Sequence, residues 1–215
     1  REAPFPAAIH DVKSAIRWLR VHADTYDIDE RRGLIWGPSA GGQLAALAAV
    51  SCGVAELDPP ARETGANNGA LESKLDPPPS SVSACLQGAV SWYGVSDFST
   101  FESPEAALYL ACESPECSPE QLARMASPVT HVDPTDPPVL FIHGSADRTV
   151  PHQQARKLYD LLRADGVEAE LLTLPGIDHS FLGATPAATR DANLTALRRT
   201  FEFIDRTIGP ASADR

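Results

Sequence analysis

The fold is decided by one stretch, Leu34-Ile35-Trp36-Gly37-Pro38-Ser39-Ala40-Gly41-Gly42-Gln43-Leu44-Ala45-Ala46. A short apolar run leads into Gly-Pro-Ser-Ala-Gly-Gly and then an alanine-rich helical pattern, which predicts a strand, an abrupt turn and a helix. The Gly-x-Ser-x-Gly motif from Gly37 to Gly41 is typical of a nucleophile elbow, a strained turn that lifts a serine hydroxyl above the sheet edge. We therefore predict Ser39 as a nucleophile; the alternative is a solvated serine in a glycine-rich turn. The backbone N–H of Ala40, at the positive end of the following helix, is the predicted oxyanion donor.

The bulk composition is that of one globular domain spanning residues 1–215. A net charge of −11 argues against binding to nucleic acid or to anionic membrane surfaces, which need clustered Lys and Arg. No apolar run approaches the roughly 20 residues of a membrane-spanning helix. The composition indicates neither a compartment nor an oligomeric state.

The four cysteines do not have the spacing of a metal site. None forms a CxxC pair with histidine partners, so we expect no zinc. Cys112 and Cys117 flank Glu-Ser-Pro-Glu, and two interpretations stay open for them: a small disulfide loop, or free thiols in a reducing compartment.

Short apolar runs alternate with helical patterns along the chain, which predicts a mostly parallel sheet covered by helices on both faces. We expect strands at 34–36, 86–92, 139–143 and 168–174, and helices at 6–24, 40–51, 151–165 and 187–208. The first helix is predicted to bury Ile9, Val12, Ala15, Ile16 and Leu19, and the last to bury Leu194, Leu197, Phe201 and Ile204.

Two segments have a different character. Residues 53–81 are rich in Pro, Gly, Asn and Ser and have no hydrophobic period, so we expect a long surface excursion. Residues 98–127 read as short helices broken by Pro104, Pro115 and Pro119, and we expect a lid or side wall there.

Three residues chemically suited to acyl transfer follow predicted strands. Ser39 follows the first strand, Asp147 the third and His179 the fourth, and the carboxyl ends of parallel strands share one sheet edge. A serine needs a histidine to take its proton, and a carboxylate to orient that histidine, so these three are the predicted triad. The order Ser…Asp…His is that of α/β-hydrolases.

Alternatives exist for the acid and the base. Asp97 also follows a strand and is a rival acid, whereas Asp178 adjoins the base and is assigned to its loop. His143 ends a strand and is predicted to be a packed, hydrogen-bonded neighbour of the acid turn. Only His179 lies in a glycine-containing loop after the last predicted strand. The remaining histidines lie elsewhere: His10, His22, His131 and His152.

The motifs jointly resemble bacterial α/β-hydrolase esterases, and most closely the feruloyl/acetyl-xylan esterase-like group beside the hormone-sensitive-lipase-like esterases. They are Phe5-Pro6, Asp11 to Leu19, Gly37 to Gly42, Trp92 to Phe98, Ala126 to Val129, Pro137 to Asp147 and Gly176 to Phe181. The resemblance implies an α/β-hydrolase fold and a small-molecule carboxylic-ester substrate (short acyl, acetyl-sugar or aryl). It also implies Ser39, Asp147 and His179 as the triad, and no cofactor.

One departure limits what the resemblance implies. The family's His-Gly-Gly segment, a second source of oxyanion donors, is not in this sequence, and the family's first four strands would lie before residue 1. We therefore expect a sheet without its N-terminal strands, and a catalytically inactive module is a competing hypothesis. A prolyl-oligopeptidase-like peptidase or amidase is another, although the chain shows no propeller-blade repeats.

Overall fold

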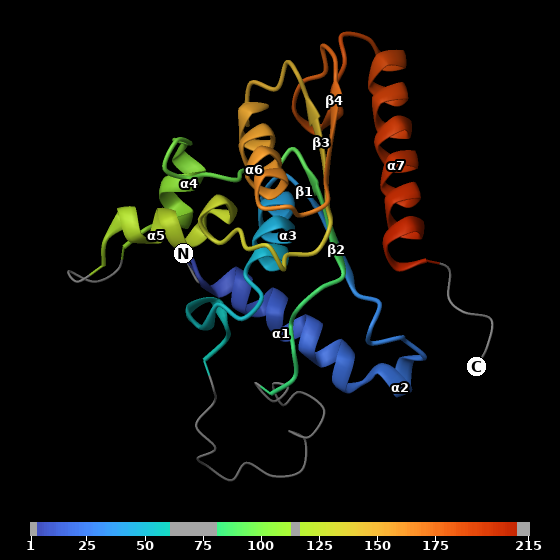
Figure 1. Ribbon diagram of the computed structural model, residues 1–215. Coiled ribbons are helices and arrows are strands. Elements are labelled where there is room, and N and C mark those ends of the chain that lie inside the picture. Colours follow the sequence, from blue (N-terminus) through green and yellow to red (C-terminus); the bar gives the residue numbers. More distant parts are fainter. Residues whose placement is uncertain (1–3, 61–80, 113–116, 210–215) are drawn as a thin grey trace.

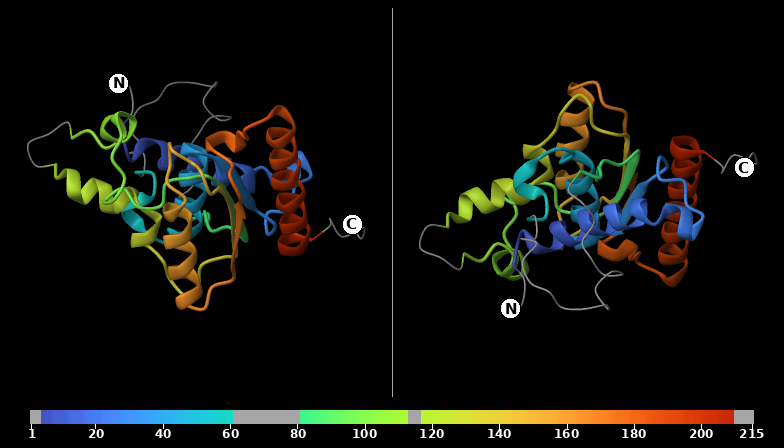
Figure 2. Two further views of the ribbon diagram at one scale, coloured as in Figure 1. Left: turned by 90° about the horizontal axis from the view of Figure 1, so that it is seen from above. Right: turned by 90° about the horizontal axis from the view of Figure 1, so that it is seen from below.

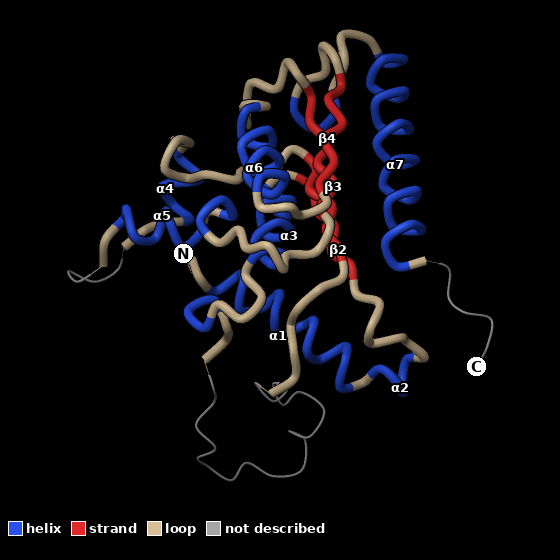
Figure 3. Tube along the Cα trace, viewed as in Figure 1, coloured by secondary structure: helices blue, strands red, loops and turns tan. Residues whose placement is uncertain are grey.

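A single parallel sheet forms the centre of the protein. The computed structural model describes residues 4–60, 81–112 and 117–209. Four strands, coloured red in Figure 3, pair in chain order: β1 (Leu34–Pro38), β2 (Gly88–Trp92), β3 (Val139–Gly144) and β4 (Ala169–Leu174). Trp36 lies opposite Val90 in the register, and Val90 opposite Leu140. The predicted α/β class is confirmed, and each strand begins and ends within two residues of its predicted bounds.

Helices cover both faces of the sheet. Parallel strands that follow one another in space as in sequence must be joined by right-handed crossovers, which all fall on one face. The crossover helices α3 (Ala40–Val50) and α6 (Gln153–Ala164) accordingly share a face, and α7 (Pro186–Ile208) packs on the other (Figures 1 and 2). Helix α1 (Ala7–Val21) packs against α3 and is followed by the short α2 (Ala23–Tyr26).

The core is formed by the two central strands and the inward faces of the helices. Every residue of β2 and β3 is buried, as expected for strands that are covered on both sides. The predicted face of α7 was wrong in part: Leu194 and Phe201 are 51% and 55% exposed, whereas Leu197 packs partly buried against the core, and the buried positions are Ala192, Ala196, Thr200 and Phe203. The buried face includes a polar contact, since the indole Nε1–H of Trp92 donates to Thr200 Oγ1 at 3.0 Å.

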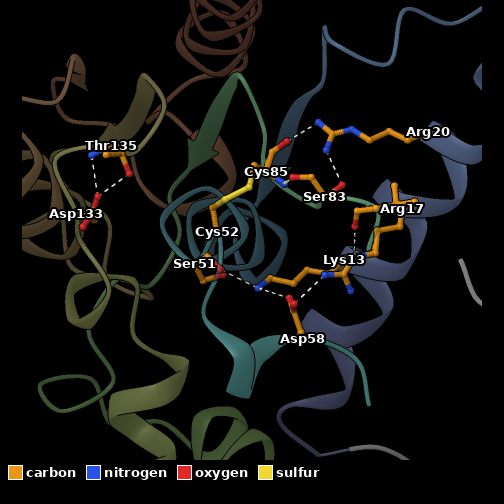
Figure 4. The surroundings of a disulfide bond; sticks show 11 residues. Lys13, Arg17, Arg20, Ser51, Cys52, Asp58, Ser83, Cys85, Asp133 and Thr135 are labelled. Atoms are coloured by element: carbon orange, nitrogen blue, oxygen red, sulfur yellow. Dashed lines mark hydrogen bonds and ion pairs between the residues drawn. A yellow bond between two sulfur atoms is a disulfide. The ribbon is translucent and has the colours of Figure 1, made fainter. Parts of the chain in front are cut away.

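Helix α1 buries two cations that the hydrophobic pattern could not predict. Ala15 is exposed and Leu19 is 45% exposed, whereas Lys13 and Arg17 are 1% and 4% exposed. Lys13 Nζ donates to the Ser51 carbonyl at 2.8 Å and to Asp58 Oδ1 at 3.0 Å, and Arg17 donates to Asp58 Oδ2 at 2.7 Å (Figure 4). These bonds give each buried cation an acceptor, although Arg17 Nη1 has no hydrogen-bond partner among the described residues, and they hold the segment after α3 against α1.

Both cysteine pairs are disulfides. Cys52 and Cys85 are bonded across 33 residues, a pairing that the sequence analysis did not predict, with Cα atoms 5.0 Å apart (Figure 4). Cys112 and Cys117 form the second bridge, which is the first of the two interpretations left open for them. The disulfide Cys52–Cys85 joins the two ends of the predicted excursion, which begins with the 3₁₀ turn Ala55–Leu57; residues 61–80 of that excursion lie outside the described residues.

The crossover from β2 to β3 contains the predicted short helices, α4 (Pro104–Tyr109) and α5 (Pro119–Ala126). Each begins with proline after a serine cap: Ser103 Oγ accepts from the Ala106 N–H at 3.0 Å, and Ser118 Oγ from the Gln121 N–H at 3.2 Å. Pro115 lies outside the described residues. None of the helices in the described ranges is long and apolar enough to cross a membrane.

Candidate active site

Ser39 occupies a strained turn between β1 and α3. Its backbone has φ 53° and ψ −119°, in the left-handed half of conformational space that non-glycine residues avoid. The Ser39 N–H donates to the Trp92 carbonyl at 2.8 Å, so the end of β2 holds the turn in place. A Cβ atom at Gly37 would lie 2.3 Å from the Gly41 carbonyl oxygen, which explains the glycine there. The turn directs the Ser39 hydroxyl to the carboxyl edge of the sheet.

The structure brings together the three residues predicted as a triad. Ser39 Oγ lies 3.0 Å from His179 Nε2, and His179 Nδ1 lies 2.8 Å from Asp147 Oδ2. The Asp147 side chain is fully buried, while that of His179 is 17% exposed. The loops after β1, β3 and β4, at the carboxyl edge of the sheet, supply one residue each. A carboxylate, an imidazole and a hydroxyl in this connected order can pass a proton from oxygen to nitrogen and stabilise the resulting cation.

Asp147 is held by its own turn. Its Oδ1 accepts the backbone N–H groups of Thr149 at 2.9 Å and Val150 at 2.8 Å. Its Oδ2 faces His179 at 2.8 Å and a second imidazole, His143 Nε2, at 3.2 Å. Three donors therefore bond to the carboxylate, and the His143 ring lies against Oδ2 as a fourth polar neighbour.

Asp178 clamps the loop that carries His179 to the loop that carries Asp147. It accepts the backbone N–H of Arg148 at 3.0 Å, the Arg148 Nε–H at 2.8 Å and the backbone N–H of His179 at 2.8 Å. These bonds, the one from the Arg148 backbone foremost, hold the pKa of Asp178 at about 2. Asp178 stays with the loop, as predicted, and leaves the imidazole to Asp147.

An aromatic ring supports the base from the side. The ring of Tyr93 meets that of His179 edge to face, with centroids 4.7 Å apart, and it meets Phe181 in the same way. Tyr93, Ser180 and Phe181 all have positive φ (39°, 56° and 55°), so backbone strain gathers around His179. Burial raises the pKa of Tyr93 above its ordinary value. The sequence analysis assigned Tyr93 no role; its position immediately after a predicted strand was the available signal.

The structure separates the rival residues from this site. Asp97 is buried and pairs with Lys157, and it accepts the Ser99 N–H at 2.8 Å, so it closes its own turn. His143 lies next to the acid turn, as predicted, with Nε2 2.8 Å from the Val150 carbonyl. His152 contacts Thr173, and His131 contacts the Met125 carbonyl.

A cavity of about 360 Å³ opens beside Ser39. Ala40, the first residue of α3, lines it, and the backbone N–H of a helix's first residue has no acceptor within its helix. Its other wall is mainly apolar and comes from the segment after β2, including Val95, Phe98, Phe101, Ala106 and Tyr109. The cavity can take an apolar group attached to a carbon that Ser39 attacks. In the described ranges, no group of three or more His, Cys, Asp or Glu side chains could hold a metal ion.

Sequence comparison agrees with this geometry. The sequence model of the BD-FAE family matches residues 1–162. The probable carboxylic ester hydrolase LipM of Mycobacterium tuberculosis is 32% identical over 193 residues, which are 86% of this chain and 41% of LipM. Esterase LipC of the same organism is 32% identical over 82% of this chain. The chain spans about two fifths of the length of these curated relatives.

Solved structures show the same fold. A truncated form of a carbohydrate esterase from gut microbiota is 28% identical with a TM-score of 0.65, covering 93% of this chain and 70% of its own. Esterase 2 of Thermogutta terrifontis has a TM-score of 0.74 over 98% of this chain and 69% of its own, and at 24% identity it supports the fold alone. The match to the family over three quarters of the sequence, the parallel sheet and the strained serine turn lead to one conclusion: this chain belongs to the BD-FAE family, within the α/β-hydrolase fold.

Proposed function

We propose that the protein hydrolyses carboxylic esters through an acyl-enzyme, with Ser39 as nucleophile, His179 as general base and acid, and Asp147 as the orienting carboxylate. The observation that carries the proposal is the continuous contact from Ser39 Oγ to His179 Nε2, at 3.0 Å, and from His179 Nδ1 to Asp147 Oδ2, at 2.8 Å. The curated relatives named as ester hydrolases support the same reaction class.

The reaction proceeds in two halves. His179 Nε2 takes the proton of the Ser39 hydroxyl as Oγ attacks the ester carbonyl carbon, and the carbonyl π electrons move onto its oxygen. The N–H of Ala40 donates to this oxyanion, and Asp147 stabilises the imidazolium. When the tetrahedral intermediate collapses, His179 protonates the departing alcohol, which leaves an acyl group on Ser39. Water, deprotonated by His179, then attacks this acyl-enzyme and releases the acid and free Ser39.

The cavity indicates where the substrate's apolar part binds. Its wall of apolar side chains, from Val95 to Tyr109, suits the acyl group or an aryl group better than a charged one. We propose short acyl, acetyl-sugar and aryl esters as the substrate classes. Hydrolysis of p-nitrophenyl acetate and of an acetylated sugar, set against an amide and a prolyl peptide substrate, separates an esterase from a peptidase.

The test is p-nitrophenyl acetate turnover by the chain beside Ser39→Ala, with Ser83→Ala as the control. Ser83 is an exposed serine next to the disulfide Cys52–Cys85 and outside the cavity. We expect Ser39→Ala to lose at least about a thousandfold in kcat and Ser83→Ala to match the unmodified chain. A fluorophosphonate label should attach to the chain and to Ser83→Ala but not to Ser39→Ala. Equal background rates and no labelling on folded protein would refute the proposal and leave an inactive module.

A further inference from the structure

We infer that His143 is a positioning residue for the triad: its Nε2–H bonds to the Val150 carbonyl while the same nitrogen lies 3.2 Å from Asp147 Oδ2, and the ring thereby holds the acid turn in place. The inference rests on the proposed function, because it assigns His143 a task in the same reaction. His143 is fully buried at the end of β3 and does not line the cavity, so it touches no substrate.

The hydrogen-bond geometry fixes the tautomer of His143. Its Nε2 lies 2.8 Å from the Val150 carbonyl oxygen, which can only accept, so Nε2 must carry a proton. Its Nδ1 is buried and has no hydrogen-bond partner among the described residues. A proton on Nδ1 would leave a buried N–H unsatisfied, so the ring is neutral with its single proton on Nε2.

That single N–H bonds to the Val150 carbonyl, and Asp147 Oδ2 lies beside it. Asp147 Oδ2 lies 3.2 Å from His143 Nε2, and the same oxygen accepts from His179 Nδ1 at 2.8 Å. The Val150 carbonyl belongs to the residue whose N–H donates to Asp147 Oδ1 at 2.8 Å. His143 therefore closes the acid turn from behind and places the positive end of its N–H dipole beside the carboxylate.

The charges around His143 favour its neutral form. The titratable groups that act on it are Asp147 in its own turn, His179 from the loop after β4 and His152 before α6. Burial is the largest influence and lowers the pKa of His143, and the two histidines act in the same direction. Asp147 opposes them, but burial prevails, so the ring acts as a fixed dipole and not as a second base.

The Nε2–H dipole beside Asp147 moderates the negative potential that His179 experiences. Without this dipole, the carboxylate stabilises the protonated base more strongly, and the base is free to accept a proton from serine only at higher pH. The acid turn also loses the bond from His143 to the Val150 carbonyl. Loss of the donor should therefore move the acid limb of the pH profile upward and lower the rate.

Two substitutions separate this role from packing. His143→Gln can place an amide N–H near the position of Nε2, while His143→Phe fills the space and removes the donor. We expect His143→Phe to lower kcat/KM for p-nitrophenyl acetate by roughly ten- to a hundredfold and to raise the acid limb by about half to one pH unit. His143→Gln should keep the limb of the unmodified chain. His131→Phe, which removes a histidine that contacts only the distant Met125 carbonyl, controls for loss of a ring.

Imidazole ¹⁵N NMR of histidine-labelled protein gives a readout that needs no turnover. In the unmodified chain at neutral pH, His143 should show the neutral form with its proton on Nε2. An Nδ1–H or charged His143 would overturn the inference even if His143→Phe fails to fold. So would folded His143→Phe and His143→Gln variants whose pH profiles share one acid limb, whether or not their rates fall. Absence of Ser39-dependent turnover with the expected NMR result would instead refute only the proposed function.

Discussion

Removing the disulfide Cys52–Cys85 should lower stability much more than removing Cys112–Cys117. A crosslink reduces the conformational entropy of the unfolded chain by an amount that grows with the logarithm of the loop it closes. The two bridges span 33 and 5 residues. The chain-entropy relation then gives losses of about 3.7 and about 2.1 kcal/mol at 25 °C, a difference of about 1.6 kcal/mol.

The folded state should change little in this experiment. Cys52 is exposed and Cys85 half-buried, so serine replacements remove little packing. Asp58 still ties the segment after α3 to Lys13 and Arg17 on α1, which keeps the first part of the excursion in place without the bridge. The cost consequently falls on the unfolded state, and activity at 25 °C should be retained.

Urea unfolding of the two double-serine variants measures this difference. The Cys52→Ser/Cys85→Ser variant should have the lower midpoint, and its melting temperature should fall by about 7–15 °C, against about 4–8 °C for Cys112→Ser/Cys117→Ser. Equal losses, or a larger loss for the short loop, would show that native contacts and not loop closure determine what these bridges contribute.

Two further outcomes follow from the elbow and from the loop clamp. Gly37→Ala should lose about 3 kcal/mol of stability and at least about a hundredfold in ester turnover, because the new methyl would meet the Gly41 carbonyl. Gly33→Ala is the control, since its Cβ would find ordinary contacts at 3.4 Å. Similar thermal unfolding and similar rates in the two variants would contradict the explanation. The pKa of Asp178 is lowered from 3.8 to about 2, so the stabilisation of the folded state by its carboxylate is complete above about pH 4 and is lost as the pH falls toward 2. In Asp178→Asn, the free energy of unfolding measured in urea should therefore change less with pH across that window. An unchanged pH dependence would assign the acid sensitivity to other groups.

The sequence predicted the sheet well, because its strands are short, almost wholly apolar and separated by clear helical patterns. The same logic placed Ser39, Asp147 and His179 at one sheet edge, where the structure brings them within hydrogen-bond distance. That prediction depends on the order of the strands and on the fact that the carboxyl ends of parallel strands share one sheet edge. Neither depends on how individual side chains pack.

The helix faces and the cysteine pairing could not be predicted in this way. Lys13 and Arg17 are buried where Asp58, more than 40 residues away in sequence, accepts a hydrogen bond from each, and a hydrophobic period cannot show such a partner. The buried face of α7 includes Thr200, which accepts a hydrogen bond from Trp92 on a strand distant in sequence. The pairing of Cys52 with Cys85 requires the ends of α3 and of the following loop to meet, since four cysteines allow three pairings and spacing does not choose among them.

The crossover between β2 and β3 has a consequence for how this protein can diversify. It supplies Val95 to Tyr109 of the cavity wall, whereas Ser39, Asp147 and His179 come from the other three loops of the same sheet edge. Exchanges of the lining residues between Val95 and Tyr109 therefore reshape what the cavity admits and leave the hydrogen-bonded residues in place. Natural selection or protein engineering can change the residues of this wall without changing the residues that carry out the reaction. The chemistry and the choice of substrate can therefore evolve at separate rates.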